Sequence, residues 1–232
     1  KVPILWPTII GTVILYAVVP LGESVPIELP QTLMGLAPSA QWILILFAYA
    51  SIASLLPIWM LLQPRAYING IQLFVGLILV YATVFIAAPP IVAPAFNLDL
   101  PANTPDLLPL LFVTVGCGAV SGFHGLVGSG TTSKQINLET DERFVCYLGS
   151  AGEGALALAA IIAVSAGFAS LDEWRAVYSE FGKGGILAFV QGGATIVSDG
   201  SGGLLRHETS KTLLTMMAVL FAGTTMDTGV RL

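Results

Sequence analysis

The sequence is poor in charge, because only 10% of its 232 residues are Asp, Glu, Lys or Arg. A typical soluble domain has about a quarter of its residues in this class. The sequence has nine basic and fourteen acidic residues, and its formal net charge is −5. A nucleic-acid partner needs a basic surface, so none is expected. The apolar share of 55% and the mean hydropathy of +0.85 predict an integral membrane protein.

Metal-ligating and catalytic patterns are also lacking. The two cysteines, Cys117 and Cys146, have no metal-ligand spacing and are expected to be small core residues. A phosphate-binding loop needs Lys directly after its second Gly, but Thr131 follows Gly130. We expect no metal, no resident cofactor and no enzymatic activity; a coupling proton or another cation is the expected small partner.

The chain begins without the features of a signal peptide, since Lys1 precedes neither a short apolar core nor a cleavage site. It stops at Leu232 within a helical pattern. We therefore expect residues 1–232 to be a single transmembrane segment from the central part of a longer protein.

Six apolar runs of roughly 20 residues are long enough to cross a bilayer. They predict an all-α fold with spans at 3–21, 41–62, 69–88, 107–129, 144–167 and 212–231. Loops 22–40 and 89–106 have no Lys or Arg, whereas the intervening loops carry Arg65, Lys134 and Arg143. This alternation places the basic loops in the cytoplasm.

Residues 168–211 are expected to form an excursion outside the membrane. Its apolar run, Ile186–Val197, is too short to span and is interrupted at Gln191–Gly193. Ser170 and Glu173 form a capping box that opens a short helix, which Gly182 ends. After this short helix we expect an amphipathic helix that lies on the helix bundle. The alternative is that residues 183–205 cross the membrane.

Prolines shape two further segments. Pro57 is expected to kink the second span and to free the carbonyl of Ala53, either as a packing kink or as a gating hinge. Six prolines in 89–109 predict an extended cover.

The stretch 116–134, GCGAVSGFHGLVGSGTTSK, is the main candidate site because six glycines and several hydroxyl residues follow the start of a span. Interrupted backbone at membrane depth is tolerated where it lines a cavity, as in transporters. A Gly118–Gly122 packing seam is the alternative for the first glycines. With Glu153, the candidate substrate and ion path comprises Ser121, Gly122, His124, Gly125, Gly128, Ser129, Gly130, Thr131, Thr132 and Lys134.

Two ionisable residues fall inside predicted spans. Glu153 lies halfway along the fifth span, where a charge costs about 2.5–3.5 kcal/mol on the insertion scale. We expect it to face the bundle interior as a proton or cation site, with a purely structural partner as the alternative. His124 is suited to a proton relay, or is a hydrogen-bonded core histidine.

The end of the last span provides secondary candidates. Asp227 and Arg231 are four residues apart, and Thr228 lies between them. An interfacial pair at the helix end is the alternative. Arg65, beside the second span, is the fourth secondary candidate.

Several stretches resemble the carbon starvation protein family: SGFHGLVGSGTTSKQI with the following ETDER, GEGALALAAIIA, ASLLPIWMLLQPRAYING and TTMDTGVRL. This family is similar to the amino acid–polyamine–organocation transporters. The resemblance implies a larger inverted-repeat bundle in the bacterial inner membrane. Ala66 stands where the family usually has Asp, which removes a partner for Arg65.

The resemblance implies a multi-pass secondary transporter that imports pyruvate or small peptides with protons during carbon starvation. Its expected partners are a small carboxylate or peptide, the lipid bilayer and the remaining helices of the parent transporter. The alternatives are a membrane-embedded hydrolase using Ser129 and His124, and a sensory or structural membrane subunit.

Overall fold

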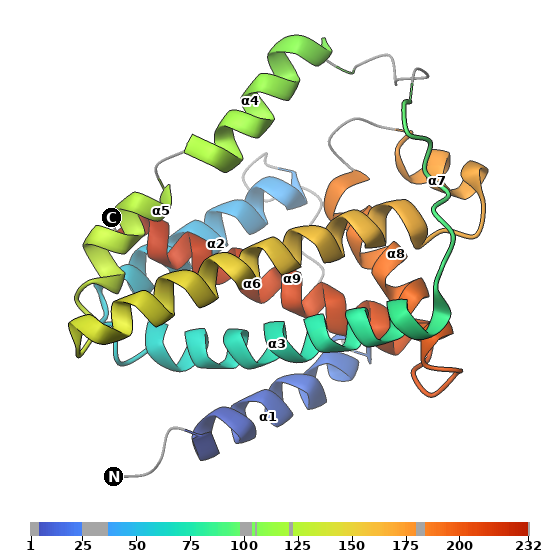
Figure 1. The fold of residues 1–232 in the computed structure, drawn as a ribbon. Coiled ribbons are helices and arrows are strands. Elements are labelled where there is room, and N and C mark those ends of the chain that lie inside the picture. Colours follow the sequence, from blue (N-terminus) through green and yellow to red (C-terminus); the bar gives the residue numbers. More distant parts are fainter. Residues whose placement is uncertain are drawn as a thin grey trace. The chain divides into compact units, whose positions relative to one another are not determined.

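The computed structural model describes residues 5–24, 37–97, 104, 106–120, 123–179 and 184–231. These residues form helices and irregular segments, with no strand among them (Figure 1). In chain order the elements are α1 (Leu5–Ser24), α2 (Pro38–Leu55), α3 (Leu62–Ala87), α4 (Leu107–Val120), α5 (Phe123–Val127), η1 (Gly128–Thr132), α6 (Glu139–Ala166), α7 (Leu171–Val177), α8 (Gly184–Gly200) and α9 (His207–Arg231).

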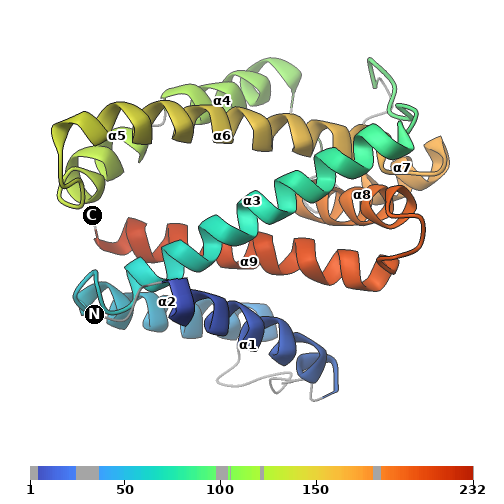
Figure 2. The same cartoon turned by 60° about the horizontal axis from the view of Figure 1, so that its bottom comes forward.

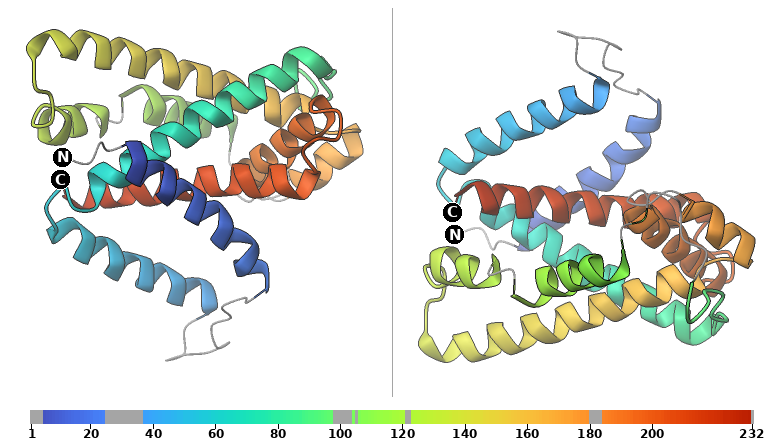
Figure 3. Two further views of the ribbon diagram at one scale, coloured as in Figure 1. Left: turned by 90° about the horizontal axis from the view of Figure 1, so that it is seen from below. Right: turned by 90° about the horizontal axis from the view of Figure 1, so that it is seen from above.

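Among the described residues, three helices, α3, α6 and α9, are long and apolar enough to cross a membrane. Figure 3 shows α3 and α9 as uninterrupted helices. Two shorter apolar stretches, Thr8–Val18 and Ala40–Leu55, lie in α1 and α2. Large apolar side chains such as Phe47, Ile78 and Ile161 are exposed, as expected of surfaces that meet lipid or further helices. The all-helical character and the apolar helices fit the predicted class, whereas six crossings stay a prediction.

The chain divides into two compact units, residues 1–74 with 219–232, and residues 75–218. In the first unit, α2 ends at Leu55 and α3 begins at Leu62. Leu56 is extended, with φ −76° and ψ 149°, because a residue before proline is driven out of the helical region. The prediction of a kinked helix over 41–62 is therefore wrong, since Pro57 ends the helix instead of bending it.

In the second unit, α8 packs against the C-terminal half of α6 (Figure 2). Ala159 and Ala163 of α6 are fully or almost fully buried. A Cβ on Gly192 would overlap the carbonyl oxygen of Ala163, and a Cβ on Gly167 would overlap the backbone of Gly192. The absence of these two Cβ atoms lets the backbones approach closely.

A helix lies where one was predicted after α7, and Gln191–Gly193, which interrupt its apolar run, lie within it. Helix α8 continues without a break, and Ala194 and Val197 are completely buried. Its glycines are contact points: a Cβ on Gly193 would lie 2.7 Å from a methyl carbon of Leu214.

The predicted capping box is confirmed at α7. Ser170 Oγ accepts a hydrogen bond from the Glu173 N–H at 3.2 Å, and the Glu173 carboxylate accepts one from the Ala169 N–H at 3.0 Å. The helix ends at Val177, earlier than predicted, and Gly182 lies outside the described residues.

A small core lies beside α7. Phe168, Trp174 and Ala188 are buried together, and Ala93 from the proline-rich segment packs against them. The N–H groups of Val92 and Ala93 both donate to the Ser165 carbonyl oxygen, at 2.9 and 3.0 Å. The described part of that segment therefore covers this core, as predicted, although its C-terminal end, from Leu107, is already helical.

The first half of α6, Glu139–Gly154, is exposed almost throughout. Cys146 lies there as an exposed free thiol, so its predicted core position is wrong. The side chain of Cys117 lies outside the described part of the chain.

Candidate functional site

The described part of the glycine-rich stretch lies in three elements. Helix α4 is described as far as Val120 and α5 from Phe123, and η1 is a π-helical turn. Ser121 and Gly122, two of the candidate site residues, lie outside the described residues. Single π-helical turns are rare in proteins, and many of those that do occur lie at functional sites.

The π-turn keeps its backbone hydrogen bonded. The Ser133 N–H donates to the Gly128 carbonyl oxygen at 2.9 Å, five residues back. Ser129 Oγ donates to the Leu126 carbonyl oxygen at 3.3 Å, and Ser133 Oγ donates to that of Ser129 at 2.7 Å. The segment therefore offers fewer free polar groups than an open loop would.

The other candidate residues of this stretch differ in exposure. Thr131 is buried, with 7% of its surface exposed. A Cβ on Gly125 or Gly128 would meet nothing within 4 Å, so these glycines serve no close contact among the described residues. Gly128, Gly130 and Thr132 are half-buried, whereas Gly125, Ser129 and Lys134 are exposed.

His124 and Glu153 are brought together from α5 and α6. His124 Nε2 lies 3.3 Å from Glu153 Oε1, and the side chains are 73% and 63% exposed. Glu153 lies on the exposed first half of α6, so its position facing the interior of the larger bundle stays a prediction. The contact joins two of the ionisable candidates into one pair.

A surface pocket of about 370 Å³ lies where η1 turns into α6. Its size falls in the range of about 300–1,000 Å³ typical of small-molecule sites. It offers a hydroxyl, two amides and a carboxylate from its polar residues, and the lining comprises Thr132, Gln135, Ile136, Asn137, Asp141 and Val145.

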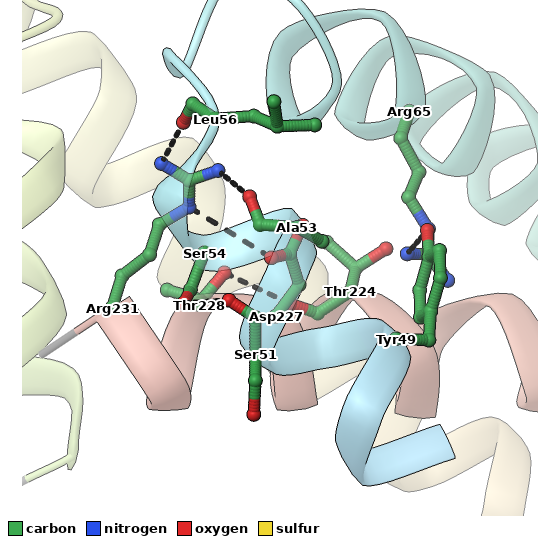
Figure 4. Close-up of polar contacts among 10 residues, drawn as sticks. All are labelled: Tyr49, Ser51, Ala53, Ser54, Leu56, Arg65, Thr224, Asp227, Thr228 and Arg231. Carbon is green, nitrogen blue, oxygen red and sulfur yellow. Dashed lines mark hydrogen bonds and ion pairs between the residues drawn. The ribbon is translucent and has the colours of Figure 1, made fainter. Parts of the chain in front are cut away.

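A second polar cluster lies in the first unit, where α2 ends (Figure 4). The Arg231 guanidinium donates from one terminal nitrogen to the Ala53 carbonyl oxygen at 2.6 Å and from the other to that of Leu56 at 2.8 Å. Last-turn carbonyls have no partner within their own helix. Arg231 thus caps α2. Pro57 has no N–H to donate to the Ala53 carbonyl oxygen, as predicted, and that oxygen also accepts a hydrogen bond from the Leu56 N–H at 3.2 Å.

Asp227 lies one turn before Arg231 and is completely buried. Its Oδ1 is 3.8 Å from Arg231 Nε, an ion-pair distance that is too long for a hydrogen bond. Within the described part of the chain, both carboxylate oxygens and Arg231 Nε have no hydrogen-bond partner. The pair does lie at the end of α9, but it is buried, so the small contribution of exposed helix pairs does not apply to it.

Two neighbouring contacts complete the cluster. The Asn69 amide donates to the Leu220 carbonyl oxygen at 3.2 Å and to the Thr224 hydroxyl. Arg65 donates to the Tyr49 hydroxyl at 3.2 Å, which replaces the acidic partner that Ala66 does not provide.

Thr228, the remaining secondary candidate, donates from its hydroxyl to the Thr224 carbonyl oxygen at 2.9 Å. Asn69 and Tyr49 were missed by the sequence reasoning, although a polar amide inside a predicted span is itself a signal. Among the described residues no group of three or more His, Cys, Asp or Glu side chains is placed to hold a metal.

Comparison with known proteins identifies the family to which the chain is similar. The profile described as carbon starvation protein CstA matches residues 1–179. The peptide transporter CstA of Helicobacter pylori is 36% identical over 166 residues, which cover 68% of this chain and 24% of that protein. The pyruvate/proton symporter BtsT of Escherichia coli is 39% identical over 127 residues, 52% of this chain and 17% of that protein. The chain thus spans about a quarter of the length of the first curated relatives it matches. No solved structure matches it.

Proposed function

Because the chain belongs to the carbon starvation protein CstA family, we propose that it forms part of a secondary active transporter. The parent protein would import pyruvate or small peptides with protons across the bacterial inner membrane, in response to carbon starvation. The names of the relatives, peptide transporter and pyruvate/proton symporter, support both substrate classes. The remaining helices of the parent would cover the exposed first half of α6.

The observation that carries this proposal is the contact of His124 with Glu153. Ionisable groups on apolar helices are expensive in a membrane, and those retained generally mark ion or substrate paths. A carboxylate and an imidazole 3.3 Å apart can share and pass on a proton. We propose that Glu153 carries the coupling proton and that His124 assists it.

The glycine-rich segment would contribute the substrate path beside this pair. Its π-turn and the amides around it would meet a carboxylate, and Lys134 would attract one. The pocket that contains Asp141 suits the amino group of a short peptide, because its lining combines a carboxylate with two amides. An anion as small as pyruvate would not use that carboxylate.

The topology proposal retains six crossings, with the loops of Arg65, Lys134 and Arg143 in the cytoplasm. Residues 168–211 would lie outside the bilayer core. In support, the apolar run Ile186–Val197 is shorter than the roughly 20 residues that a crossing needs.

A hydrolase is the less well supported alternative. It would need Ser129 Oγ and His124 to be partners, but Ser129 donates to the Leu126 carbonyl and His124 contacts Glu153. A sensory subunit would bind the ligand without moving it.

The test is uptake of labelled pyruvate or dipeptide into proteoliposomes that hold the full-length protein, with and without an inward pH gradient. We expect gradient-driven accumulation of one substrate, lost in Glu153→Gln and kept in Glu142→Gln, an exposed acid on the same helix. Full accumulation in Glu153→Gln would remove Glu153 from coupling. Ligand binding without flux would replace transport by sensing, and peptide cleavage abolished by Ser129→Ala would establish the hydrolase.

A further inference from the structure

Asp227 is the buried acid among the described residues, and its surroundings provide it with no hydrogen-bond donor. An ionised carboxylate that leaves water normally needs such donors, because burying a charge without them is costly. Here its compensation is the Arg231 guanidinium at 3.8 Å. Adding a proton to Asp227 would therefore break no hydrogen bond.

Arg231 is the group that would respond to such a proton. Its charge cannot be lost by deprotonation in proteins. It lies 11% exposed, with two carbonyl oxygens and one carboxylate around it. While Asp227 is ionised, the guanidinium is held between the end of α2 and its own helix. Once Asp227 is neutral, the two carbonyl dipoles alone must balance a nearly buried positive charge.

The other ionisable groups of the cluster do not replace Asp227. The Arg65 side chain extends from α3 into the cluster. Its guanidinium lies against Gly223, which is one turn before Asp227 on α9. Tyr49 from α2 accepts the hydrogen bond of Arg65. The cluster therefore holds two guanidinium groups, one phenol and one carboxyl, and protonation of Asp227 leaves it without a negative charge.

A second contact would keep the helices together. Asn69 on α3 bonds to Leu220 and Thr224 on α9 through groups that do not titrate. The contact of α9 with α3 is thus insensitive to protonation, whereas its contact with the end of α2 depends on a charge. Loss of that charge would free one helix end while the other pairing stays.

We propose that Asp227 is a proton-binding site and that its charge controls the hold of Arg231 on the end of α2. Ionised Asp227 keeps the guanidinium on the Ala53 and Leu56 carbonyls; protonated Asp227 releases it. The link of this proton to uptake rests on the proposed transport function, whereas the proton site itself does not.

The direct test is infrared difference spectroscopy of the full-length protein between alkaline and acidic pH. We expect the carbonyl stretching band of one protonated carboxylic acid to be missing in Asp227→Asn and present in Asp172→Asn, an exposed acid on α7. Identical difference spectra for wild type and Asp227→Asn would overturn the proposal.

Uptake gives the second measurement. Asp227→Asn should lose accumulation driven by the pH gradient, and Asp172→Asn should keep it. Unchanged accumulation in Asp227→Asn would overturn the link of this proton to uptake, whereas the infrared titration decides the proton site. If the wild-type protein carries no substrate, the transport function fails while the infrared titration still decides the proton site. Should Asp227→Asn fail to fold, Asp227→Glu keeps an acid in place and must shift the band.

Discussion

Replacing Gly192 with alanine tests the contact that holds α8 on α6. A Cβ at this position would overlap the Ala163 carbonyl oxygen and lie 3.0 Å from its carbonyl carbon. Both are backbone atoms, which cannot rotate away as a side chain does. The helices must therefore move apart, and the buried face formed by Ala163, Ala194 and Val197 loses contacts.

The magnitude follows from two opposing effects. Overpacking a core costs about 1–3 kcal/mol, and a backbone overlap belongs at the upper end. Alanine regains up to about 1 kcal/mol of helix propensity over glycine. We expect a net loss of about 2 kcal/mol in the free energy of local unfolding of α8, or an increase of about 30-fold in the exchange rate of its protected amides.

The assay is amide hydrogen exchange of the full-length protein, read over Gly184–Gly200 by mass spectrometry. The matched control is Gly185→Ala in the same helix, where a Cβ would meet nothing within 4 Å. There alanine should leave exchange unchanged or slow it. Equal exchange in Gly192→Ala and Gly185→Ala would refute the reasoning.

A double variant sharpens this test. Gly167→Ala inserts its Cβ into the same crossing, against the Gly192 backbone. Because one substitution already separates the helices, the combined loss should be smaller than the sum of the two single losses. Strict additivity would mean that the two glycines act at independent sites.

Three further predictions concern the segment around α7. Trp174→Phe removes the indole N–H that donates to the Val164 carbonyl oxygen at 3.0 Å and should cost about 1 kcal/mol in unfolding free energy, whereas Trp59→Phe, at an exposed position, should cost nothing measurable by thermal melting. Ser170→Ala removes the cap of α7 and should lower its local stability by about 0.5–2 kcal/mol, seen as faster amide exchange in Leu171–Val177 and nowhere else. Burial raises the pKa of the Tyr178 phenol above 10.0, so the folded state favours the neutral phenol. The free energy of unfolding should therefore fall as pH rises above about 10, where the phenol ionises in the unfolded chain. Tyr178→Phe should remove this part of the alkaline decrease in melting temperature.

The helices themselves could be predicted from hydropathy, because a run of apolar residues is a local property. The predicted span 144–167 corresponds to α6, which begins five residues earlier because Glu139 and the polar residues after it form its exposed first turns. Periodicity describes such polar turns poorly. Pro57 was recognised as a backbone break, but whether a proline bends or ends a helix depends on what receives the freed carbonyls, and here that group lies in α9.

The glycines of α8 show a different limit of sequence reasoning. Glycine in a helix interior costs about 1 kcal/mol relative to alanine, so helix propensity alone disfavours Gly192 and Gly193. In the structure the same glycines are what allow α8 to reach α6, and burial of the faces around them offsets the propensity cost. A helix-propensity scale does not include this packing energy, because the contact partner, Ala163, is 29 positions away along the chain.

Asp227 and Arg231 show how far the environment changes the weight of one pattern. An oppositely charged pair four residues apart on an exposed helix contributes about 0.2–0.5 kcal/mol to the stability of the helix. At that strength the pair is only a secondary candidate for a functional site. In a buried pair, removing one member leaves an uncompensated charge and costs about 3–5 kcal/mol. The burial that moves Asp227 and Arg231 from the first case to the second depends on the end of α2, more than 150 residues away, which Pro57 determines. A proline in one span and an acid in another thus make one site, and neither residue indicates it alone.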